Sequence, residues 1–527
     1  MTLKREVYAE LEQIVGADHI SDKPHVLAGN RHALPAAAVK PVSPEAILLP
    51  ASADEVARIV RVCNRHGLRY IPIVSGLIFF AYPTQPGTII IHLKRMNYIE
   101  FRDEDRMVIL EPGIRHVQLQ PEALRRGLTY PAAAVGPGGT VLGNFACSAG
   151  DNHNQNGSSR TNRYLLGIEW VTPEGEIVQL GSLATGSGWF CADGPGPSLR
   201  GLIRGYSGAM GSFGVVTRIA IGLEPWSGPE VLPHEGRTPD YIVRLPRDTH
   251  RAFVFKFPTL DAVRDAMHEI GKAEIGAGVI KYFNCTAALL CTSSANEFHE
   301  LWDSGLFQRE LAMPLYVYLA THSAAEMTYQ QRVLEDIVQE FGGAPVDARI
   351  QKFYDDNMDF YVLLGSLQRV LRLGGAWAPD KLEADSVHHM FEAGKRIKEY
   401  FPEMIAQGLV FDAPDNWQII PLEYGHVAHI EHLFLWERSH PAFAQIPGML
   451  MGKSMESDLK YGIHAKTIMA GGPLLERFGP LYSNYHVWLN ALRAAFGAAP
   501  AGGPPGPPGA AGHPPRGPSA QGGTRPP

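Results

Sequence analysis

The chain has 527 residues, of which 45% are hydrophobic and 19% are charged, so it can form two or three domains with buried cores. With 47 basic and 54 acidic residues, the formal net charge is −7. This balance argues against a general nucleic-acid binder, because such proteins need a surplus of lysine and arginine. The five cysteines form no Cys-x-x-Cys pair, so we expect neither a disulfide framework nor an iron–sulfur cluster.

No targeting signal is evident in the sequence. The N-terminus lacks the apolar core and the small-residue cleavage site of a signal peptide. The longest apolar stretch, Ile71–Tyr82, is too short to span a bilayer and is interrupted by Pro72, Ser75 and Gly76. We therefore expect a cytoplasmic protein without an integral membrane segment.

Residues 43–225 alternate between helix and strand patterns. The first helix is expected to begin after Ser52, because Ser52 and Glu55 have the spacing of a capping box, and Gly67 marks its end. A second helix is expected at Ile114–Arg126. The expected strands are Tyr70–Val74, Thr88–Leu93, Arg106–Glu111, Ile168–Thr172, Glu176–Leu180 and Gly214–Leu223.

Residues 240–450 show a second pattern, in which strands alternate with long helices. The expected strands are Val254–Phe257, Gly278–Phe283 and Pro314–Thr321, and the expected helices are Leu260–Ile270, Ala325–Phe341 and Asp385–Tyr400. After residue 452 the pattern is helical again, with candidates at Leu474–Phe478 and Tyr482–Phe496. The last 31 residues, 497–527, contain nine glycines and ten prolines, so we expect a disordered tail.

Two glycine-rich stretches, Gly136–Gly150 and Gly205–Thr217, are candidates for binding an anion. Glycine lets backbone N–H groups approach a phosphate closely, because no Cβ atom intervenes. Hydroxyl groups that can add donors are those of Thr140, Ser148, Ser207 and Ser212. The alternative is that these glycines only form turns. Neither a convincing Gly-x-Gly-x-x-Gly motif nor a P-loop motif is present, which disfavours a Rossmann fold and a P-loop NTPase.

Seven short segments, taken in order, resemble the vanillyl-alcohol oxidase/PCMH superfamily of FAD flavoenzymes. Within it they are similar to FAD-linked oxidases of the glycolate oxidase, D-lactate dehydrogenase and 4-cresol dehydrogenase types. The segments are Leu49–Val56, Ile71–Gly76, Ile91–Asn97, Val108–Gly113, Gly138–Asn144, Gly167–Glu176 and Gly208–Thr217. The family's first phosphate loop usually reads Gly-Gly-Gly-Thr, whereas here Val74-Ser75-Gly76-Leu77 keeps a single glycine.

The resemblance implies an α+β fold with two domains, a PCMH-type FAD-binding domain and an α+β cap that holds the substrate. The FAD-binding domain would cover residues 1–225 with a C-terminal return at 452–496, and the cap would cover residues 235–450. FAD would be bound non-covalently, because the first phosphate loop contains no histidine. The cofactor contacts that the resemblance implies are Val74, Ser75, Gly76, Pro137, Gly138, Thr140, Gly143, Asn144, Ser148, Gly150, Gly211, Gly214, Val215 and Val216.

Candidates for moving a proton during the reaction lie late in the chain. Read as a strand, residues 423–432 place His426 and His432 on one face, and His429 and Glu431 on the other. We predict His426, His432 and His464 as catalytic residues, because the resemblance brings both of their segments toward the flavin. One alternative is that these are ordinary buried histidines. Another is a divalent metal held by two histidines and a glutamate.

The resemblance implies an enzyme, an FAD-dependent oxidase or dehydrogenase. It would remove a hydride from a small hydroxy acid, or from an aromatic alcohol or phenol, to flavin N5 and pass the electrons to O2 or a partner acceptor protein. A flavin-bearing or degenerate subunit of a larger electron-transfer complex is the alternative that the altered phosphate loop suggests. A metal-dependent hydrolase built on the histidines would leave the seven ordered segments unexplained. The expected partners are a small-molecule substrate and no nucleic acid, and a homo-oligomer stays open.

Overall fold

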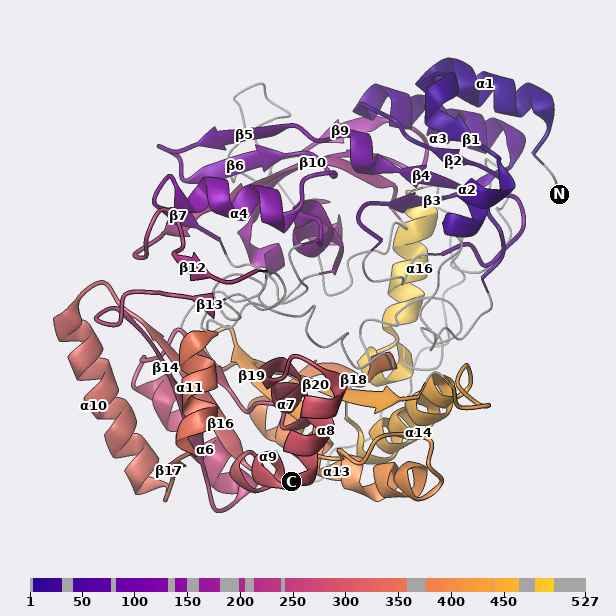
Figure 1. The fold of residues 1–527 in the computed structure, drawn as a ribbon. Coiled ribbons are helices and arrows are strands. Elements are labelled where there is room, and N and C mark those ends of the chain that lie inside the picture. Colours follow the sequence, from indigo (N-terminus) through magenta and orange to yellow (C-terminus); the bar gives the residue numbers. More distant parts are fainter. Residues whose placement is uncertain are drawn as a thin grey trace, which may run out of the picture.

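The computed structural model describes residues 3–30, 41–76, 82–130, 138–148, 161–180, 199–203, 213–237, 242–357, 376–437, 439–463 and 479–496. The elements form two regions that lie against each other, one from the N-terminal part of the chain and one from its second half (Figure 1). A single helix near the C-terminus, α16 (Tyr485–Ala495), lies beside both regions. Within these ranges, no helix combines the length and the apolar character needed to cross a bilayer.

The first region begins with a four-stranded sheet in the order β1-β2-β4-β3. Its strands are β1 (Ile20–Ser21), β2 (Ile47–Leu48), β3 (Arg69–Ile73) and β4 (Thr88–His92), and β2 and β3 run parallel to β4. The helices of this part are α1 (Arg5–Val15), α2 (Pro24–Gly29) and α3 (Ala53–His66). The buried faces of α1 and α3 form one apolar core with β4.

The start of α3 confirms the expected helix signal. The Ser52 side chain accepts a hydrogen bond from the backbone N–H of Glu55 at 3.2 Å, and Gly67 ends the helix in a left-handed conformation. The Glu55 carboxylate reaches back to the N–H of Ala51 at 2.8 Å, one residue before the position of an ideal capping box.

A second sheet of the first region has five antiparallel strands in the order β5-β6-β10-β8-β9. They are β5 (Ile99–Arg102), β6 (Met107–Leu110), β8 (Leu165–Val171), β9 (Ile177–Gln179) and β10 (Val215–Gly222). The remaining elements are α4 (His116–Leu124), the short helices η3 (Gly143–Ser148), η4 (Thr161–Tyr164) and α5 (Leu199–Ile203), and the pair β7 (Leu128–Thr129) and β11 (Glu224–Pro225). Buried side chains of α4 and η3 pack onto this sheet, so the Gly138–Asn144 loop is anchored to its core.

The second region contains a four-stranded sheet, β15-β16-β14-β17, and a three-stranded sheet, β18-β20-β19. Their strands are β14 (His250–Lys256), β15 (Gly278–Ile280), β16 (Pro314–Ala320), β17 (Ala344–Pro345), β18 (Ala376–Asp385), β19 (Trp417–Leu422) and β20 (Val427–Trp436). Lys281 and Ile419 form a bridge with backbone hydrogen bonds of 3.0 and 2.9 Å, which joins the two sheets at their edges. The short pair β12 (His234–Glu235) and β13 (Ile242–Val243) lies nearest the first region (Figure 1).

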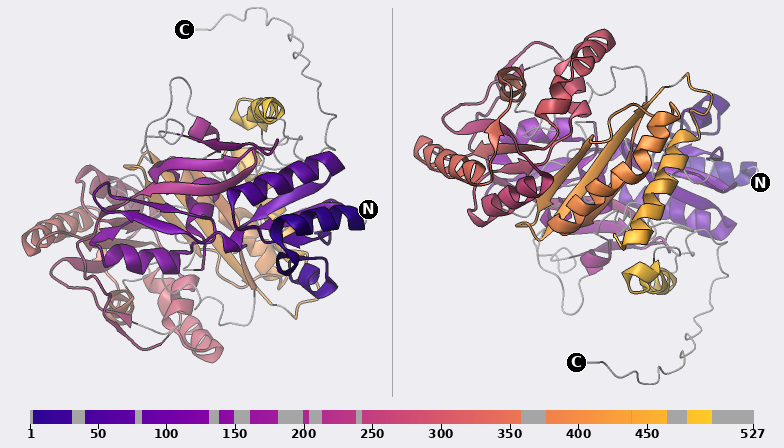
Figure 2. Two further views of the ribbon diagram at one scale, coloured as in Figure 1. Left: turned by 90° about the horizontal axis from the view of Figure 1, so that it is seen from above. Right: turned by 90° about the horizontal axis from the view of Figure 1, so that it is seen from below.

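Helices cover the joined sheet on both faces. On one face lie α6 (Leu260–Lys272), α10 (Ala324–Glu340), α13 (Val387–Ala406) and α14 (Ile446–Tyr461), and on the other lie α7 (Cys285–Cys291), α8 (Ala295–Asp303), α9 (Leu306–Glu310) and α11 (Ala348–Asp356). Figure 2 shows α13 and α14 running along the outer face of the orange strands. On the other face, apolar side chains of β19 and β20 pack into the core with α7, α8, α9 and α11, namely Ile420, Leu422, Leu433 and Leu435. The turn between β19 and β20 reaches the first region, where Glu423 pairs with Arg163.

The mixed helix and strand composition confirms the expected α+β class, but the C-terminal part differs from the expectation. Residues 452–461 belong to α14, which packs against α13 and β18 of the second region, so this segment does not return to the first region. The return is made by α16, because Leu489 and Phe496 pack against Phe213. The candidate helix at residues 474–478 and the tail at 497–527 lie outside the described residues.

Candidate functional site

Two loops of the first region meet where β3 ends. A Cβ atom added to Gly143 would lie 2.8 Å from Thr140 Oγ1 and 3.3 Å from Val74 Cγ2, so the loop after β3 and the Gly138–Asn144 loop are in contact. Gly76 follows in a left-handed conformation, with a φ of 63°, which favours glycine. The sequence-predicted positions Val74, Ser75, Gly76, Gly138, Thr140, Gly143 and Asn144 are thus brought together at one end of the sheet.

The Thr140 side chain has an unusual environment for a hydroxyl group. It is 4% exposed, and its Oγ1 atom has no hydrogen-bond partner among the residues that the structure describes. A buried hydroxyl without a partner is costly, and buried polar atoms normally find one. The Thr140 hydroxyl and the narrow space at Gly143 therefore form a cradle suited to a polar ligand that brings its own acceptor.

Basic side chains lie around the same loops. His92 ends β4 opposite Ile73, and burial lowers its pKa to about 4, with the positive charges of Lys94 and Arg115 adding to this effect. Arg115 is also the bridge partner of Thr140. His92 is therefore neutral near pH 7, and the positive charge near the end of β4 comes from Lys94 and Arg115, although the chain as a whole is acidic. The sequence did not single out these three residues, because the pairing of β3 with β4 brings His92 to the end of β3 and a separate bridge brings Arg115 to Thr140.

The third expected cofactor segment begins β10. Gly214 has a φ of 113°, and a Cβ atom added there would lie 2.0 Å from the carbonyl oxygen of Val171. Val215 and Val216 are buried in the cores of the first region, so their side chains point into the protein. A cofactor contact from these residues would have to use backbone atoms, and it stays a prediction. Pro137, Gly150 and Gly211, and the side chain of Ser148, lie outside the described residues.

In the second region, the structure separates the three histidines of residues 426–432. His426 lies in the exposed turn between β19 and β20, before the strand begins. Ala428, Ile430 and Phe434 pack into the core that α13 covers, so His432 belongs to that face and His429 to the opposite one. The three side chains therefore do not converge on a single point. Within the described ranges, no group of three or more His, Cys, Asp and Glu side chains is placed to hold a metal ion.

His432 is part of a buried polar network beneath the sheet. Its Nδ1 atom forms a short hydrogen bond with Asp380, which also accepts a hydrogen bond from the Tyr400 hydroxyl at 2.8 Å. The His432 ring packs edge-on against Phe401 of α13, with ring centroids 4.9 Å apart. A catalytic role for His432 stays a prediction, and this position between sheet and helix favours a structural role. His464 lies outside the described residues.

The face of β20 opposite His432 carries a second set of polar groups. The Gln418 side chain on β19 donates a hydrogen bond of 2.9 Å to the Glu431 carboxylate, which is directly across the strand pair. His429 lies two residues earlier on the same face and is 7% exposed. The expected alternation along residues 427–432 is thus confirmed, but Gln418 could be found only from the register of β19 with β20.

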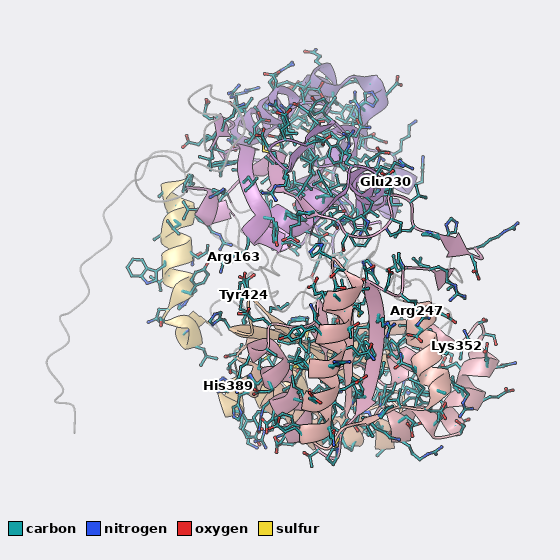
Figure 3. All side chains as sticks on the ribbon, turned by 90° about the vertical axis from the view of Figure 1, so that its left-hand side faces the viewer. Arg163, Glu230, Arg247, Lys352, His389 and Tyr424 are labelled. Atoms are coloured by element: carbon teal, nitrogen blue, oxygen red, sulfur yellow. The ribbon has the colours of Figure 1, made fainter. Side chains whose placement is uncertain are left out.

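The turn between β19 and β20 reaches across to the first region. Arg163 of η4 forms an ion pair with Glu423 at 3.6 Å, and Figure 3 shows Arg163 and Tyr424 facing the space between the two regions. Glu423 and Tyr424 both have left-handed backbone conformations, with φ values of 53° and 60°. Non-glycine residues in this conformation are strained and often occur near functional sites. The exposed His426 therefore lies at the junction of the two regions.

Comparison with known proteins identifies the first region. Residues 44–181 match the family model described as an FAD binding domain. A 1'-carboxy-chondrochloren decarboxylase of Chondromyces crocatus is 32% identical over 193 residues, which cover 34% of this chain and 34% of that protein. A D-lactate dehydrogenase of Anaerostipes hadrus is 27% identical over 278 residues, covering 49% of this chain and 54% of that protein. The chain thus spans about a third to a half of the length of these relatives.

Solved structures show that the fold extends over both regions. A 4-ethylphenol oxidase from Gulosibacter chungangensis superposes with a TM-score of 0.71 at 17% sequence identity, covering 93% of this chain and 94% of that one. A p-cresol methylhydroxylase gives a TM-score of 0.72 at 16% identity over the same shares. The fold is therefore of the PCMH type, as expected from the sequence.

The family match shows that the first region contains an FAD-binding domain, and the solved structures show that both regions share the fold of p-cresol methylhydroxylase. FAD is the cofactor of this domain. The loops described above fit it, because the Thr140 hydroxyl lacks a protein partner in the described ranges, Gly143 leaves space only for backbone, and Lys94 and Arg115 supply positive charge for a diphosphate.

Proposed function

We propose that this protein is an FAD-dependent oxidoreductase. Its substrate is a small hydroxy acid, or an aromatic alcohol or phenol, and the electrons pass to O2 or to a partner acceptor. The observation that carries the proposal is the polar group of Gln418, His429 and Glu431 on the face of β19 and β20 that α13 and α14 do not cover, next to the turn that pairs with the first region. A hydroxy-acid dehydrogenase among the sequence relatives and a phenol oxidase of the same fold support the two substrate classes.

The loops of the first region would hold the cofactor, which when bound supplies a hydride acceptor. The Thr140 hydroxyl would donate to an FAD oxygen atom, and the backbone at Gly76, where no Cβ atom intervenes, would approach the diphosphate. Lys94 and Arg115 would offset its negative charge. We propose that the attachment is non-covalent, since the described part of the first phosphate loop, Val74–Gly76, has no side chain that forms such a bond.

On the substrate side, we propose that His429 and Glu431 handle the proton that must leave as a hydride is removed. His429 is almost fully buried, so a proton held there is shielded from solvent. Gln418 donates to one carboxylate oxygen of Glu431 and so fixes its orientation. His426, at the junction of the two regions, stays a candidate for contacting the substrate or closing its entrance.

The test is anaerobic reduction of the flavin in the purified protein. D-Lactate, glycolate, 4-ethylphenol and p-cresol are added separately, and bleaching of the visible flavin absorbance is followed. Bleaching by an acid alone or by a phenol alone selects the substrate class. Flavin that is present but reduced by none of a wide panel of either class would contradict the proposal and favour the alternative, a flavin-bearing subunit of a larger complex.

Substitution tests the proton-handling residues. His429→Gln and Glu431→Gln should each slow flavin reduction by about 100-fold, which is the lower end of what general acid–base catalysis contributes. The matched control is His389→Gln on α13, because His389 is exposed and lies on the side of the sheet away from the first region. Equal rates of flavin reduction in all three variants would exclude His429 and Glu431 as the residues that handle the proton.

The mode of flavin attachment is tested by acid precipitation of the protein. A yellow colour that stays in the pellet would exclude non-covalent attachment.

A further inference from the structure

We infer that His116, together with Tyr130, is a positioning residue that holds Asn144 and the Gly138–Asn144 loop in the conformation that receives FAD. The inference rests on FAD binding by the first region, but it is independent of the substrate and of the residues that handle the proton. None of the seven segments that resemble the flavoenzyme family contains His116 or Tyr130.

The backbone around His116 is paired with the flavin loop. The N–H of His116 donates to the carbonyl of Gly139 at 3.0 Å, and the N–H of Val141 donates to the carbonyl of Ile114 at 3.0 Å. Arg115 and Thr140 form the antiparallel bridge between these two bonds. Residues 114–116 and 139–141 therefore move as one unit, and the start of α4 is tied to the loop that carries the Thr140 hydroxyl.

The His116 side chain makes a second connection to the end of the same loop. Its Nε2 atom lies 2.7 Å from Asn144 Oδ1, and its Nδ1 atom lies 3.0 Å from the Tyr130 hydroxyl. The carbonyl oxygen of Asn144 accepts a further hydrogen bond from the Thr161 hydroxyl at 2.9 Å. Asn144 is thus held through its side chain from one side and through its backbone from the other.

The protonation state of His116 follows from its surroundings. Burial lowers the pKa of His116 to about 4, so the imidazole is neutral near pH 7 and has one donor and one acceptor nitrogen. The Asn144 oxygen can only accept, so Nε2 carries the hydrogen atom and Nδ1 accepts from the Tyr130 hydroxyl. The Asn144 oxygen therefore sets the tautomer of His116, and the Tyr130 hydroxyl stabilises that tautomer by donating to Nδ1.

The hydrogen bonds from Tyr130 through His116 to Asn144 lie in the interior of the protein, where water cannot replace them. The exposed fractions of His116, Tyr130 and Asn144 are 0%, 3% and 5%, so water does not compete for their polar atoms. The rings of His116 and Tyr130 are stacked with centroids 5.7 Å apart, and Tyr130 packs in turn against Phe145. Because Gly143 has no free space around it, a tilt of Asn144 would displace the neighbouring Gly143 and Thr140.

The experiment compares FAD binding by the full-length protein after the flavin has been stripped. Flavin fluorescence gives the dissociation constant, and the melting temperature of the apoprotein reports stability separately. His116→Leu should raise the dissociation constant by about tenfold or more, because it leaves the Asn144 oxygen and the Tyr130 hydroxyl unpaired inside the protein. His116→Gln should restore binding to within about threefold of the wild type, since its amide N–H can replace Nε2–H. Tyr130→Phe should weaken binding by about threefold.

The matched control is His250→Leu. His250 is also fully buried, and burial lowers its pKa to about 4 as well, but it lies on β14 in the second region. This variant should lower the melting temperature of the apoprotein and leave the dissociation constant for FAD unchanged. If His116→Leu does not fold, the dissociation constants of His116→Gln and Tyr130→Phe for FAD still test whether the Nε2–H donor and the Tyr130 hydroxyl matter.

Three results would overturn the inference. They are a wild-type dissociation constant in both His116→Leu and Tyr130→Phe, an equal loss of affinity in His250→Leu, and no difference between His116→Gln and His116→Leu. Wild-type apoprotein that takes up no FAD would instead contradict the cofactor assignment and the proposed function, so the two failures are distinguishable.

Discussion

Thr140 shows how a single side chain can serve a ligand at a cost to the empty protein. Its hydroxyl is buried and lacks a partner among the described residues, although Thr140 is well placed within the loop that contacts Val74. A side chain selected only for stability would be apolar at such a position. The environment of Thr140 is therefore better explained by a bound cofactor than by packing.

Thr140→Val should separate these two effects. Valine has nearly the same shape and removes only the hydroxyl, so the apoprotein should be unchanged or more stable, by up to about 1 kcal/mol. FAD affinity should fall by about fivefold to tenfold, because a hydrogen bond to the cofactor is lost. Calorimetric titration of the apoprotein with FAD measures both the affinity and the enthalpy. Thr140→Ser, which keeps the hydroxyl, is the control, and equal affinities for Val and Ser would contradict the assignment.

Gly214 illustrates a different constraint at the level of one residue, because both its conformation and its surroundings exclude a side chain. Gly214→Ala should destabilise the protein by roughly 3 kcal/mol or more, since a left-handed residue is strained and the added methyl group would overlap the Val171 carbonyl. Gly448→Ala in α14 is the control. Gly448 is an exposed helical glycine with open space around it, so this change should stabilise the protein by about 0.5–1 kcal/mol. Urea unfolding curves give both values, and equal shifts would refute the argument.

Among the elements, β18 carries two buried charged residues, Asp380 and Lys381, whose partners lie on other elements. Lys381 donates to Asp458 of α14 at 2.6 Å, and neither side chain is exposed. Asp380, at the irregularity in the pairing with β20, contacts His432, and its backbone oxygen accepts from Ser454 at 2.9 Å. These contacts fix β18 to α14 and to β20, and so hold the β18–β20–β19 sheet in place.

Breaking the Lys381–Asp458 pair should be far more costly than breaking a surface pair. Lys381→Met leaves a buried carboxylate without its counter-ion and should cost about 3–5 kcal/mol. The double variant Lys381→Met, Asp458→Leu should recover most of this loss, because no charge is left buried. Lys272→Met removes an exposed ion pair with Glu269 and should change the stability far less, because solvent already screens the two charges. A double variant no more stable than the single one would show that the charges do not act as a pair.

Across the whole molecule, three histidines in different places share one property. His92 and His116 lie in the first region and His250 in the second, and burial lowers the pKa of each from 6.5 to about 4. Between these two pH values the unfolded chain binds protons that the folded chain does not. Stability therefore rises with pH across this window, is fully present above about 6.5 and is lost as the pH falls toward 4.

Acid sensitivity should accordingly be reduced by removing one of these groups. Each histidine contributes about 1–3 kcal/mol to the loss of stability between pH 6.5 and pH 4, and the partly exposed His92 contributes least. His116→Gln should lower the urea midpoint at pH 7.5 but lose less than the wild type on going to pH 5. If the urea midpoints of the wild type and of His116→Gln fell equally between pH 7.5 and pH 5, the low pKa of His116 would be contradicted. His389→Gln, which alters an exposed histidine, should follow the wild type.

Local patterns allowed much of the fold to be predicted. The helix α3 was predicted from Ser52, Glu55 and Gly67, and the strands β3, β4, β6, β8 and β10 from their apolar runs, because these signals act between near neighbours in the chain. The strand β18 was not predicted. Its interior contains Pro379, Asp380 and Lys381, which read as a turn, and the partners that bury them are distant residues of β20 and α14.

The candidate site was likewise predicted only in part from the sequence. The resemblance of seven ordered segments to known flavoenzymes predicted an FAD-binding domain, which the family match over residues 44–181 confirms. Such loops owe their chemistry to backbone geometry that a short motif encodes, whereas the individual cofactor contacts stay predictions. The sequence also established the alternation of His429 and His432 along one strand. Which helices cover each of these faces, the pairing of Arg115 with Thr140, and the grip of His116 on Asn144 depended on strand register and on helix packing. Those contacts join residues far apart in the chain, so they arise only when the strands have paired and the helices have packed onto the sheets.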